Sequence, residues 1–311
     1  MNQNLAIGAD IGGSHISCAA VDITSGKVLK ETLIEREVDN QAHAFQIISV
    51  WSDAVASSLS KVDVKSVKGI GFAMPGPFDY VKGISYIKGV AKYEDLYGFN
   101  IGDAILSSLD VPDSFQARFI NDVSGFAVGE ASFGKGCGYG RVASITLGTG
   151  LGSAFIDNRV PVVDGNEVPR LGCVYHIPYK EGIADDYFST RFFTRSYREA
   201  TGKELKGVKE LSALAGTDKV VDDLFSSFGK DLAVFLAPYL NAFKTEILII
   251  GGNISYAYGH FGKIFEEQLK KEKCDCKVTL SELKEDAALL GSAYLFDDNF
   301  WSAVQHALPL M

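Results

Sequence analysis

The chain has 311 residues, of which 47% are hydrophobic and 22% charged, a composition typical of a globular protein with a sizeable core. Its net charge of -9 disfavours nucleic acid as the main partner, because an acidic chain repels a polyanion. The longest apolar runs fall far short of the roughly 20 residues of a membrane span, and residues 1–4 show no signal-peptide pattern. Five scattered cysteines suit a reducing cytoplasm, so we expect a cytoplasmic protein without a membrane partner.

The length favours two domains, and the first part of the chain begins with short apolar runs. They predict strands at residues 4–9, 17–22, 28–34 and 67–73. Apolar residues at helical spacing predict a helix over residues 42–59. The fourth strand ends at Pro75-Gly76-Pro77, which stops regular structure.

The remaining chain alternates strand and helix patterns. It predicts strands at residues 119–121, 141–147, 153–156 and 246–250, and helices at 123–132, in much of 184–240 and at 286–296. Residues 157–183 are polar and irregular. Each half contains a glycine turn between two apolar strands, around Gly12-Gly13 and around Gly148-Thr149-Gly150. Two similar α/β halves are the simplest architecture that fits this internal echo.

The glycine turns have a functional and a plain interpretation. Without a Cβ, backbone N–H groups in such turns can approach a ligand closely and bind phosphate oxygens. Each turn also carries a hydroxyl residue, Ser14 or Thr149. The alternative is that they are ordinary tight hairpin turns that need glycine for backbone reasons. Neither fits the lysine-containing phosphate loop, and neither opens a helix as a dinucleotide site requires.

Two aspartates and a third glycine pair follow strands. Asp10 ends the first strand and can hold a metal-bound water or cap its turn. Asp122 lies between a strand and a helix, where its carboxylate either faces a crevice or caps the helix. Gly251-Gly252-Asn253 ends the last predicted strand, as a nucleotide-edge turn or a plain turn.

In combination these motifs are far more specific than each alone. Their order is Asp10-x-Gly-Gly-Ser, Pro75-Gly-Pro, Asn121-Asp122, Gly148-Thr-Gly-x-Gly and Gly251-Gly-Asn. The sequence resembles the ROK family of sugar kinases and sugar-responsive repressors, in the actin-like ATPase superfamily, over essentially its whole length. The resemblance implies an α/β fold of two actin-like (ribonuclease H-like) domains flanking a central cleft. We expect an N-terminal domain of residues 1–118, with 297–311 packing back on it, and a C-terminal domain of residues 119–296.

The resemblance also implies site residues. Gly12, Gly13 and Ser14 would form the first phosphate turn, with Asp10 toward Mg²⁺ through water. Gly148, Thr149 and Gly150 would form the second, and Gly251, Gly252 and Asn253 would border the adenosine of ATP. Asp122 would be the general base, because a sugar hydroxyl is a poor nucleophile until its proton is removed. We further expect Gly13 and Gly148 to require glycine both for positive φ and for close approach of phosphate.

The sugar side departs from the family. The resemblance implies that Asn121, Pro75 and Gly76 bind the sugar. The sugar site of the family also includes a Glu-x-Gly-His segment, and the matching residues of this chain are Cys173-Val-Tyr-His176. His176 would then be a sugar ligand or a plain structural histidine. Asp185 stands where a second sugar-binding Glu is usual. The cysteine-rich zinc element that follows in many members is missing, so we expect no zinc site.

These residues imply an ATP- and Mg²⁺-dependent kinase for a hexose or amino sugar, glucokinase-like, and family members are often homodimers. The alternative is a catalytically degenerate member that binds sugar or nucleotide as a sensor. A repressor is disfavoured, because the first phosphate hairpin begins near residue 5 and leaves no room for a helix-turn-helix.

Overall fold

The computed structural model describes residues 4–90 and 92–311. Residues 1–3, which belong to the stretch without a signal-peptide pattern, lie outside the described residues. The chain forms two compact units, of which the first comprises residues 1–137, 159–161 and 285–311. The second comprises residues 138–158 and 162–284. Among the described residues, no helix combines the length and apolar character needed to cross a membrane.

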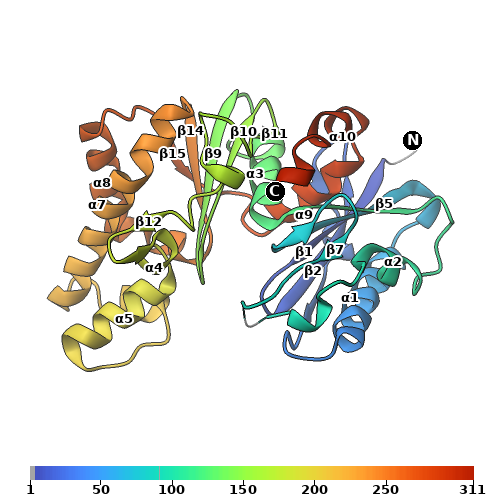
Figure 1. Ribbon diagram of the computed structural model, residues 1–311, viewed down its shortest axis with the longest axis horizontal. Helices are drawn as coiled ribbons and strands as arrows, with labels where there is room; N and C mark the ends of the chain where they lie inside the picture. The colour runs from blue at the N-terminus through green and yellow to red at the C-terminus, as the bar shows by residue number, and fades with distance from the viewer. Residues whose placement is uncertain (1–3, 91) are drawn as a thin grey trace. The chain divides into compact units, whose positions relative to one another are not determined.

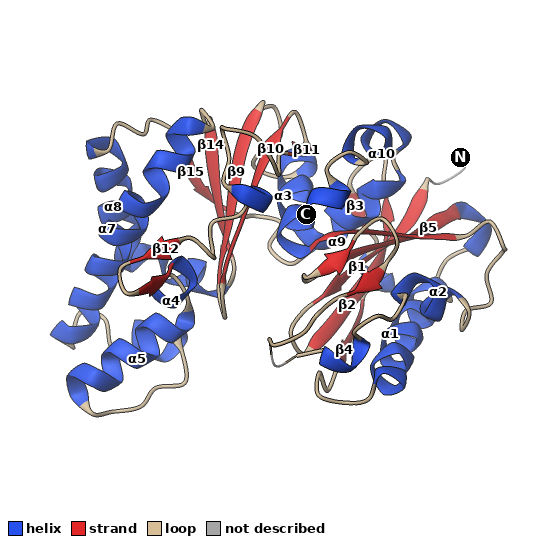
Figure 2. Ribbon diagram, viewed as in Figure 1, coloured by secondary structure: helices blue, strands red, loops and turns tan. Residues whose placement is uncertain are grey.

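The first unit is built on a mixed sheet (Figures 1 and 2). Its strands are β1 (Leu5–Ile11), β2 (His15–Asp22), β3 (Lys27–Val28), β4 (Ile34–Glu37), β5 (Val67–Met74) and β8 (Gln116–Asn121). Strand β1 pairs antiparallel with β2 and parallel with β5, which pairs parallel with β8. The carboxyl ends of β1, β5 and β8 therefore lie at one edge of this sheet, which is where ligands bind in open α/β sheets.

Helices cover both faces of this sheet (Figure 1). The helices of this unit are α1 (Ala44–Leu59), α2 (Ile101–Leu106), α3 (Asp122–Phe133), α9 (Asp286–Ala293) and α10 (Asp298–Val304). Small strands β6 (Phe78–Asp79) and β7 (Ile84–Ser85) form a hairpin, and β11 (Val160–Pro161) is grouped with this unit. Helix α9 approaches the strands so closely that a Cβ at Gly8 would collide with the Leu289 carbonyl, and one at Gly71 with that of Ser292. Glycine is required there by close approach.

The second unit repeats the central pairing of the first. Its strands are β9 (Arg141–Leu147), β10 (Leu151–Asp157), β14 (Ile247–Gly251) and β15 (Lys277–Leu280), with a small hairpin of β12 (Pro178–Tyr179) and β13 (Gly182–Ile183). Strand β9 pairs antiparallel with β10 and parallel with β14, which pairs parallel with β15. The repeat predicted from the two glycine turns is thus present as two equivalent sheets, each with a hairpin followed by two parallel strands.

The helices of the second unit are α4 (Ala184–Tyr187), α5 (Thr190–Thr201), α6 (Val208–Ser212), α7 (Lys219–Ala242) and α8 (Tyr258–Lys271). Its core joins apolar residues of β9 and β14 to the aromatic rings of α7 and α8. Phe228 on α7 stacks edge-on against Phe261 on α8, with ring centres 5.1 Å apart. This core holds β9 and β14 side by side, and so fixes the turns at their ends.

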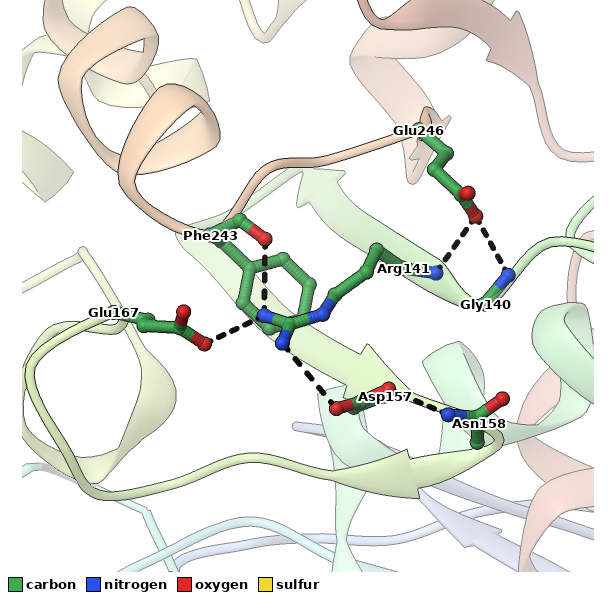
Figure 3. Close-up of polar contacts among 7 residues, drawn as sticks. All are labelled: Gly140, Arg141, Asp157, Asn158, Glu167, Phe243 and Glu246. Atoms are coloured by element: carbon green, nitrogen blue, oxygen red, sulfur yellow. Dashed lines mark hydrogen bonds and ion pairs between the residues drawn. The ribbon is translucent and has the colours of Figure 1, made fainter.

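A polar cluster anchors the start of β9, opposite its glycine turn (Figure 3). The Arg141 guanidinium donates to Glu167 at 2.6 Å and to the Phe243 carbonyl at 3.1 Å, and lies 3.5 Å from Asp157. Its plane also lies over the Phe243 ring, 4.8 Å from the ring centre. The Glu246 carboxylate accepts from the Arg141 amide at 2.9 Å. These bonds join β9, the end of β10 and the start of β14, so we assign the cluster a structural role.

Three features differ from the sequence-based expectations. The strand predicted over residues 28–34 is interrupted, because residues 30–32 form a short 3-10 helix whose Thr32 hydroxyl accepts from the Ala20 amide. Strand β15 lies in a stretch for which no strand was predicted. The two units also divide the chain differently from the boundary at 118/119: β8 belongs with the first unit because it pairs with β5, and α9 because it packs on β1 and β5.

Candidate active site

The edge of the first sheet gathers several predicted site residues. Asp10 lies one residue before the end of β1, Pro75 and Gly76 follow β5, and Asn121 ends β8 directly before Asp122. The parallel register pairs Asp10 with Ala73 and Met74 with Asn121. The parallel pairing of β1, β5 and β8 therefore brings these residues to the same edge of the sheet.

Asn121, and not Asp122, is the N-cap of helix α3. Its Oδ1 accepts from the Ser124 amide at 3.1 Å, while its Nδ2 donates to Asp122 Oδ1 at 2.9 Å. Asp122 Oδ1 also accepts from the Val123 amide at 2.9 Å. Among the described residues, no other residue bonds to Asp122 Oδ2. The plain interpretation of Asp122 as a helix cap is therefore wrong: one oxygen is held in place and the other is available.

A tyrosine that the sequence did not single out supports this arrangement. The Tyr80 hydroxyl donates to the Met74 carbonyl at 3.1 Å and accepts from Asn121 Nδ2 at 3.3 Å. It thus ties the end of β5 to the residue that orients Asp122. This role depends on the pairing of β5 with β8, two strands that lie far apart in the sequence.

Burial raises the pKa of both aspartates at this edge. Burial, followed by the charges of Asp122 and Glu285, raises the pKa of Asp10 to about 7. Burial also raises the pKa of Asp122, although its hydrogen bond from Val123 and the charge of Lys92 oppose this shift. Carboxyl groups with raised pKa values are typical of functional sites.

The first glycine turn lies directly after β1, and its carbonyl groups accept hydrogen bonds from other parts of the first unit. The Tyr93 hydroxyl donates to the Gly12 carbonyl at 2.7 Å, and the Asn40 side chain donates to that of Gly13. The Val38 amide donates to the Ser14 carbonyl at 2.8 Å. The amides of Gly13 and Ser14 have no partner among the described residues, and both residues are exposed.

The second glycine turn, between β9 and β10, has the same character. The amide and hydroxyl of Thr190 donate to the Gly148 carbonyl at 2.8 and 2.9 Å, and the Gly148 amide donates to the Gly150 carbonyl at 3.0 Å. The amides of Thr149 and Gly150 have no partner among the described residues. Each unit therefore presents two adjacent free N–H groups, the arrangement that binds phosphate oxygens.

The expected need for positive φ at Gly13 and Gly148 is wrong. Neither glycine has positive φ. A Cβ at Gly13 would meet nothing within 4 Å, and one at Gly148 would lie 4.0 Å from the Asn253 amide. Any requirement for glycine at these two positions comes from what binds to the turn, because the fold itself leaves room for a side chain.

Gly252 does need its glycine. Its φ is +80°, and a Cβ there would lie 2.5 Å from the Leu147 carbonyl oxygen. This close packing places Gly251-Gly252-Asn253 beside Gly148. The predicted adenosine turn and the predicted second phosphate turn therefore adjoin within the second unit.

Asp185 lies at the second glycine turn. Its Oδ1 accepts from the Leu151 amide at 2.6 Å, and its Oδ2 pairs with Arg191. Both oxygens are thus engaged with protein groups. Nothing in the sequence signalled this support of the turn, because Leu151 is 34 residues away.

His176 lies beside Cys173, with Nδ1 3.7 Å from Sγ. Burial raises the pKa of the Cys173 thiol to about 11, so it is protonated near neutral pH. The Tyr175 carbonyl accepts from the Asp185 amide at 3.0 Å, which joins this segment to Asp185. Among the described residues, no group of three or more His, Cys, Asp or Glu side chains is arranged to hold a metal ion.

Comparison with known proteins identifies the family. The model of the ROK family matches residues 6–299. A glucokinase of Thermotoga maritima is 26% identical, over 94% of this chain and 97% of that protein. An N-acetyl-D-glucosamine kinase of Mannheimia succiniciproducens is 24% identical, over 93% of this chain and 98% of that protein.

A solved structure shares the fold of the chain. The ROK family glucokinase of Streptomyces griseus in complex with glucose and AMPPNP matches with a TM-score of 0.74. It is 24% identical, and the match covers 94% of this chain and 98% of that one. The fold is therefore that of the actin-like ATPases, and the chain belongs to the ROK family.

Proposed function

We propose that this chain is an ATP-dependent sugar kinase, which transfers the γ-phosphoryl group of ATP to a hydroxyl of a hexose or amino sugar. Relatives named as glucokinase and N-acetyl-D-glucosamine kinase support the reaction class. The observation that carries the proposal is Asp122, whose Oδ1 is fixed by Asn121 and Val123 and whose Oδ2 is available.

The residues fit ATP and Mg²⁺. The free amides of Gly13 and Ser14, and of Thr149 and Gly150, are donors for phosphate oxygens. Gly251, Gly252 and Asn253 would border the adenosine. The pKa of Asp10 is raised by burial and then by the charges of Asp122 and Glu285, a repulsion that a cation relieves, and Asp10 would hold Mg²⁺ through water. When bound, Mg²⁺ neutralises negative charge on the phosphates.

In this mechanism Asp122 acts as general base. Its Oδ2 accepts the proton of the sugar hydroxyl while that oxygen forms its bond to the γ-phosphorus and the bond to ADP breaks. The raised pKa of Asp122 makes it a stronger base than an exposed aspartate. Asn121 holds Oδ1 and so orients the carboxylate, and Tyr80 in turn holds Asn121.

The sugar contacts form a second part of the proposal. Pro75 and Gly76 at the sheet edge and His176 in the second unit are the proposed sugar ligands. Asn121 was expected as another, but its side chain already bonds to Ser124 and Asp122, so we assign it to the orientation of Asp122. Asp185 was expected among the sugar ligands. Because both of its oxygens bond to protein groups, we assign it first to the support of the second glycine turn.

A sugar panel tests the proposal. ADP release from ATP and Mg²⁺ is measured with glucose, mannose, N-acetylglucosamine, N-acetylmannosamine, allose and fructose. At least one sugar should raise ADP release at least 100-fold over the sugar-free rate. No stimulation by any of them, with protein that binds ATP, would reject the kinase in favour of the second candidate below.

The second candidate is a sugar or nucleotide sensor without turnover. Cys173 favours it, because a protonated thiol replaces the carboxylate that the family uses toward the sugar. A sensor shows sugar-dependent thermal stabilisation, since a ligand that binds only the folded state stabilises it, but no ADP release. The same panel therefore separates the two candidates.

Three further properties belong to the proposal. We expect a cytoplasmic protein, a homodimer, and no stoichiometric zinc. Light scattering tests the dimer, and elemental analysis of the purified protein tests the zinc, of which one tightly held equivalent would contradict us.

A further inference from the structure

Helix α5 of the second unit, which is labelled in Figure 1, has one apolar and one cationic face according to the burial of its residues. Phe193 and Tyr197 are buried, at a spacing of four residues. Arg191, Arg195 and Arg198 are exposed, at spacings of four and three residues that place them on one side of the helix. Arg191 pairs with Asp185 at the second glycine turn, whereas Arg195 and Arg198 have no role in the proposed kinase mechanism.

The three arginines line a cavity of about 450 Å³. Its other lining residues are Asp186, Thr194, Glu204 and Leu205. This volume lies within the range of small-molecule sites, roughly 300–1,000 Å³. The cavity thus combines a ligand-sized space with three guanidinium groups.

The positive charge of this cavity is incompletely neutralised. Arg195 has no ion pair among the described residues: it donates to the Asp186 carbonyl at 3.3 Å and lies over the Tyr187 ring, 5.7 Å from its centre. The Asp186 carboxylate accepts a hydrogen bond from the Ile183 amide at 3.1 Å, within its own turn. Glu204 is 3.7 Å from Arg198, but its side chain is 81% exposed. Such surface pairs contribute little, so an anion can displace Glu204.

The sequence around these arginines is also rich in positive charge. Residues 190–209 contain six lysines and arginines against two glutamates, in a chain with a net charge of -9. The charged residues that line the cavity are three arginines against Asp186 and Glu204, so the lining is net positive on an acidic protein and attracts anions. Guanidinium groups match the oxygens of phosphate in geometry, and a phosphate monoester carries nearly two negative charges at pH 7.

We propose that the cavity on α5 is a binding site for the phosphate group of a small phosphate monoester, held by Arg195 and Arg198 with the Thr194 hydroxyl nearby. Arg191 at its edge links it to the second glycine turn, because Arg191 pairs with Asp185, which accepts from the Leu151 amide. A ligand that draws on Arg191 competes with Asp185 for it. The site stands independently of the proposed kinase activity.

Calorimetric titration at constant ionic strength tests the proposal, with inorganic phosphate and glucose 6-phosphate as probes and glucose as the uncharged control. The variant is Arg195→Gln/Arg198→Gln, in which both changed residues are exposed. Lys209→Gln is the matched control, because it removes an exposed cation of α6 outside the cavity. Circular dichroism checks that each variant is folded.

We expect both phosphate probes to bind the wild type and the control equally, and the double variant at least 10-fold more weakly. Glu204→Gln, which removes a cavity carboxylate, should tighten binding about 2- to 3-fold. Phosphate bound at the glycine turns is unaffected by these substitutions, so only the change between variants counts. Equal affinity in the double variant, or no binding to the wild type at 20 mM probe, would overturn the proposal. Binding of glucose 6-phosphate alone shows that the sugar contributes, whereas equal binding of both probes shows that the phosphate suffices; either supports it.

Discussion

Asn121 donates a hydrogen bond to Asp122 Oδ1 at 2.9 Å while its own Oδ1 caps helix α3. One side chain thus starts the helix with its oxygen and orients the proposed base with its nitrogen. The two roles are carried by different atoms of Asn121, so substitution can separate them.

Asn121→Ser keeps a capping oxygen but removes the nitrogen that holds Asp122. Because serine caps helices about as well as asparagine, we expect the melting temperature to change little, while kcat falls about 10-fold. Asn100→Ser is the control, since Asn100 caps α2 through the same kind of bond at 3.1 Å. Equal kcat values in the two variants would contradict the role of Asn121 in orienting Asp122.

Gly148→Val tests the second glycine turn without disturbing the fold. A Cβ at Gly148 has room and its φ is not positive, so we expect a folded protein. Its side chain would cover the free amides, and ATP affinity should fall at least 100-fold by titration. Gly207→Val, at an extended backbone position, should bind ATP normally. Normal ATP binding by Gly148→Val would refute the phosphate assignment.

Arg191→Gln tests whether Asp185 supports that turn. Loss of Arg191 leaves Asp185 without its ionic partner and frees it to move from the Leu151 amide. We expect ATP affinity to fall about 3- to 10-fold. Arg195→Gln, on the same helix face but without contact to Asp185, should leave ATP affinity unchanged. If the two variants bind ATP alike, the support of the turn does not depend on Arg191.

Asp10 should make stability depend on pH. Its pKa is about 7 in the folded protein, against 3.8 as the ordinary value, so its ionisation destabilises the fold as pH rises through this interval. Asp10→Asn removes this penalty. We expect Asp10→Asn to melt several degrees above wild type at pH 8 in EDTA, and equally at pH 4.

The exposed Asp53→Asn on α1 is the control for removal of one negative charge. It should shift the melting temperature by a similar small amount at both pH values. A pH-independent shift in Asp10→Asn would mean that Asp10 carries no raised pKa.

Much of the fold follows from the sequence, because glycine turns and apolar runs are local signals. Both hairpins and the parallel strands β5, β8 and β14 lie close to their predicted positions. Parallel pairing then brings Asp10 to the same sheet edge as Asp122. Strand β15 escaped detection because it has only four residues and none of them is buried.

The supports of the site could not be predicted. Tyr80 and Tyr93 act through hydrogen bonds to residues 41 and 81 positions away in the chain, and Arg191 through an ion pair with Asp185, six positions before it. No periodicity encodes such contacts, and a tyrosine or arginine in a loop or on a helix surface gives no local sign of its partner. The same limit applies to the cap of α3, where two neighbouring residues both suited the position and only the structure assigns Asn121.

Asp122→Asn tests the central claim most directly, by kcat with a sugar that the wild type phosphorylates. The substitution keeps the shape and the oxygen that accepts from Asn121 and Val123, but removes the basic oxygen. The account predicts that kcat falls by roughly 10²–10⁴, with ATP affinity and melting temperature nearly unchanged, whereas Asp297→Asn, at the N-cap of α10, retains full kcat. A kcat of Asp122→Asn within a factor of three of the wild-type value would contradict it.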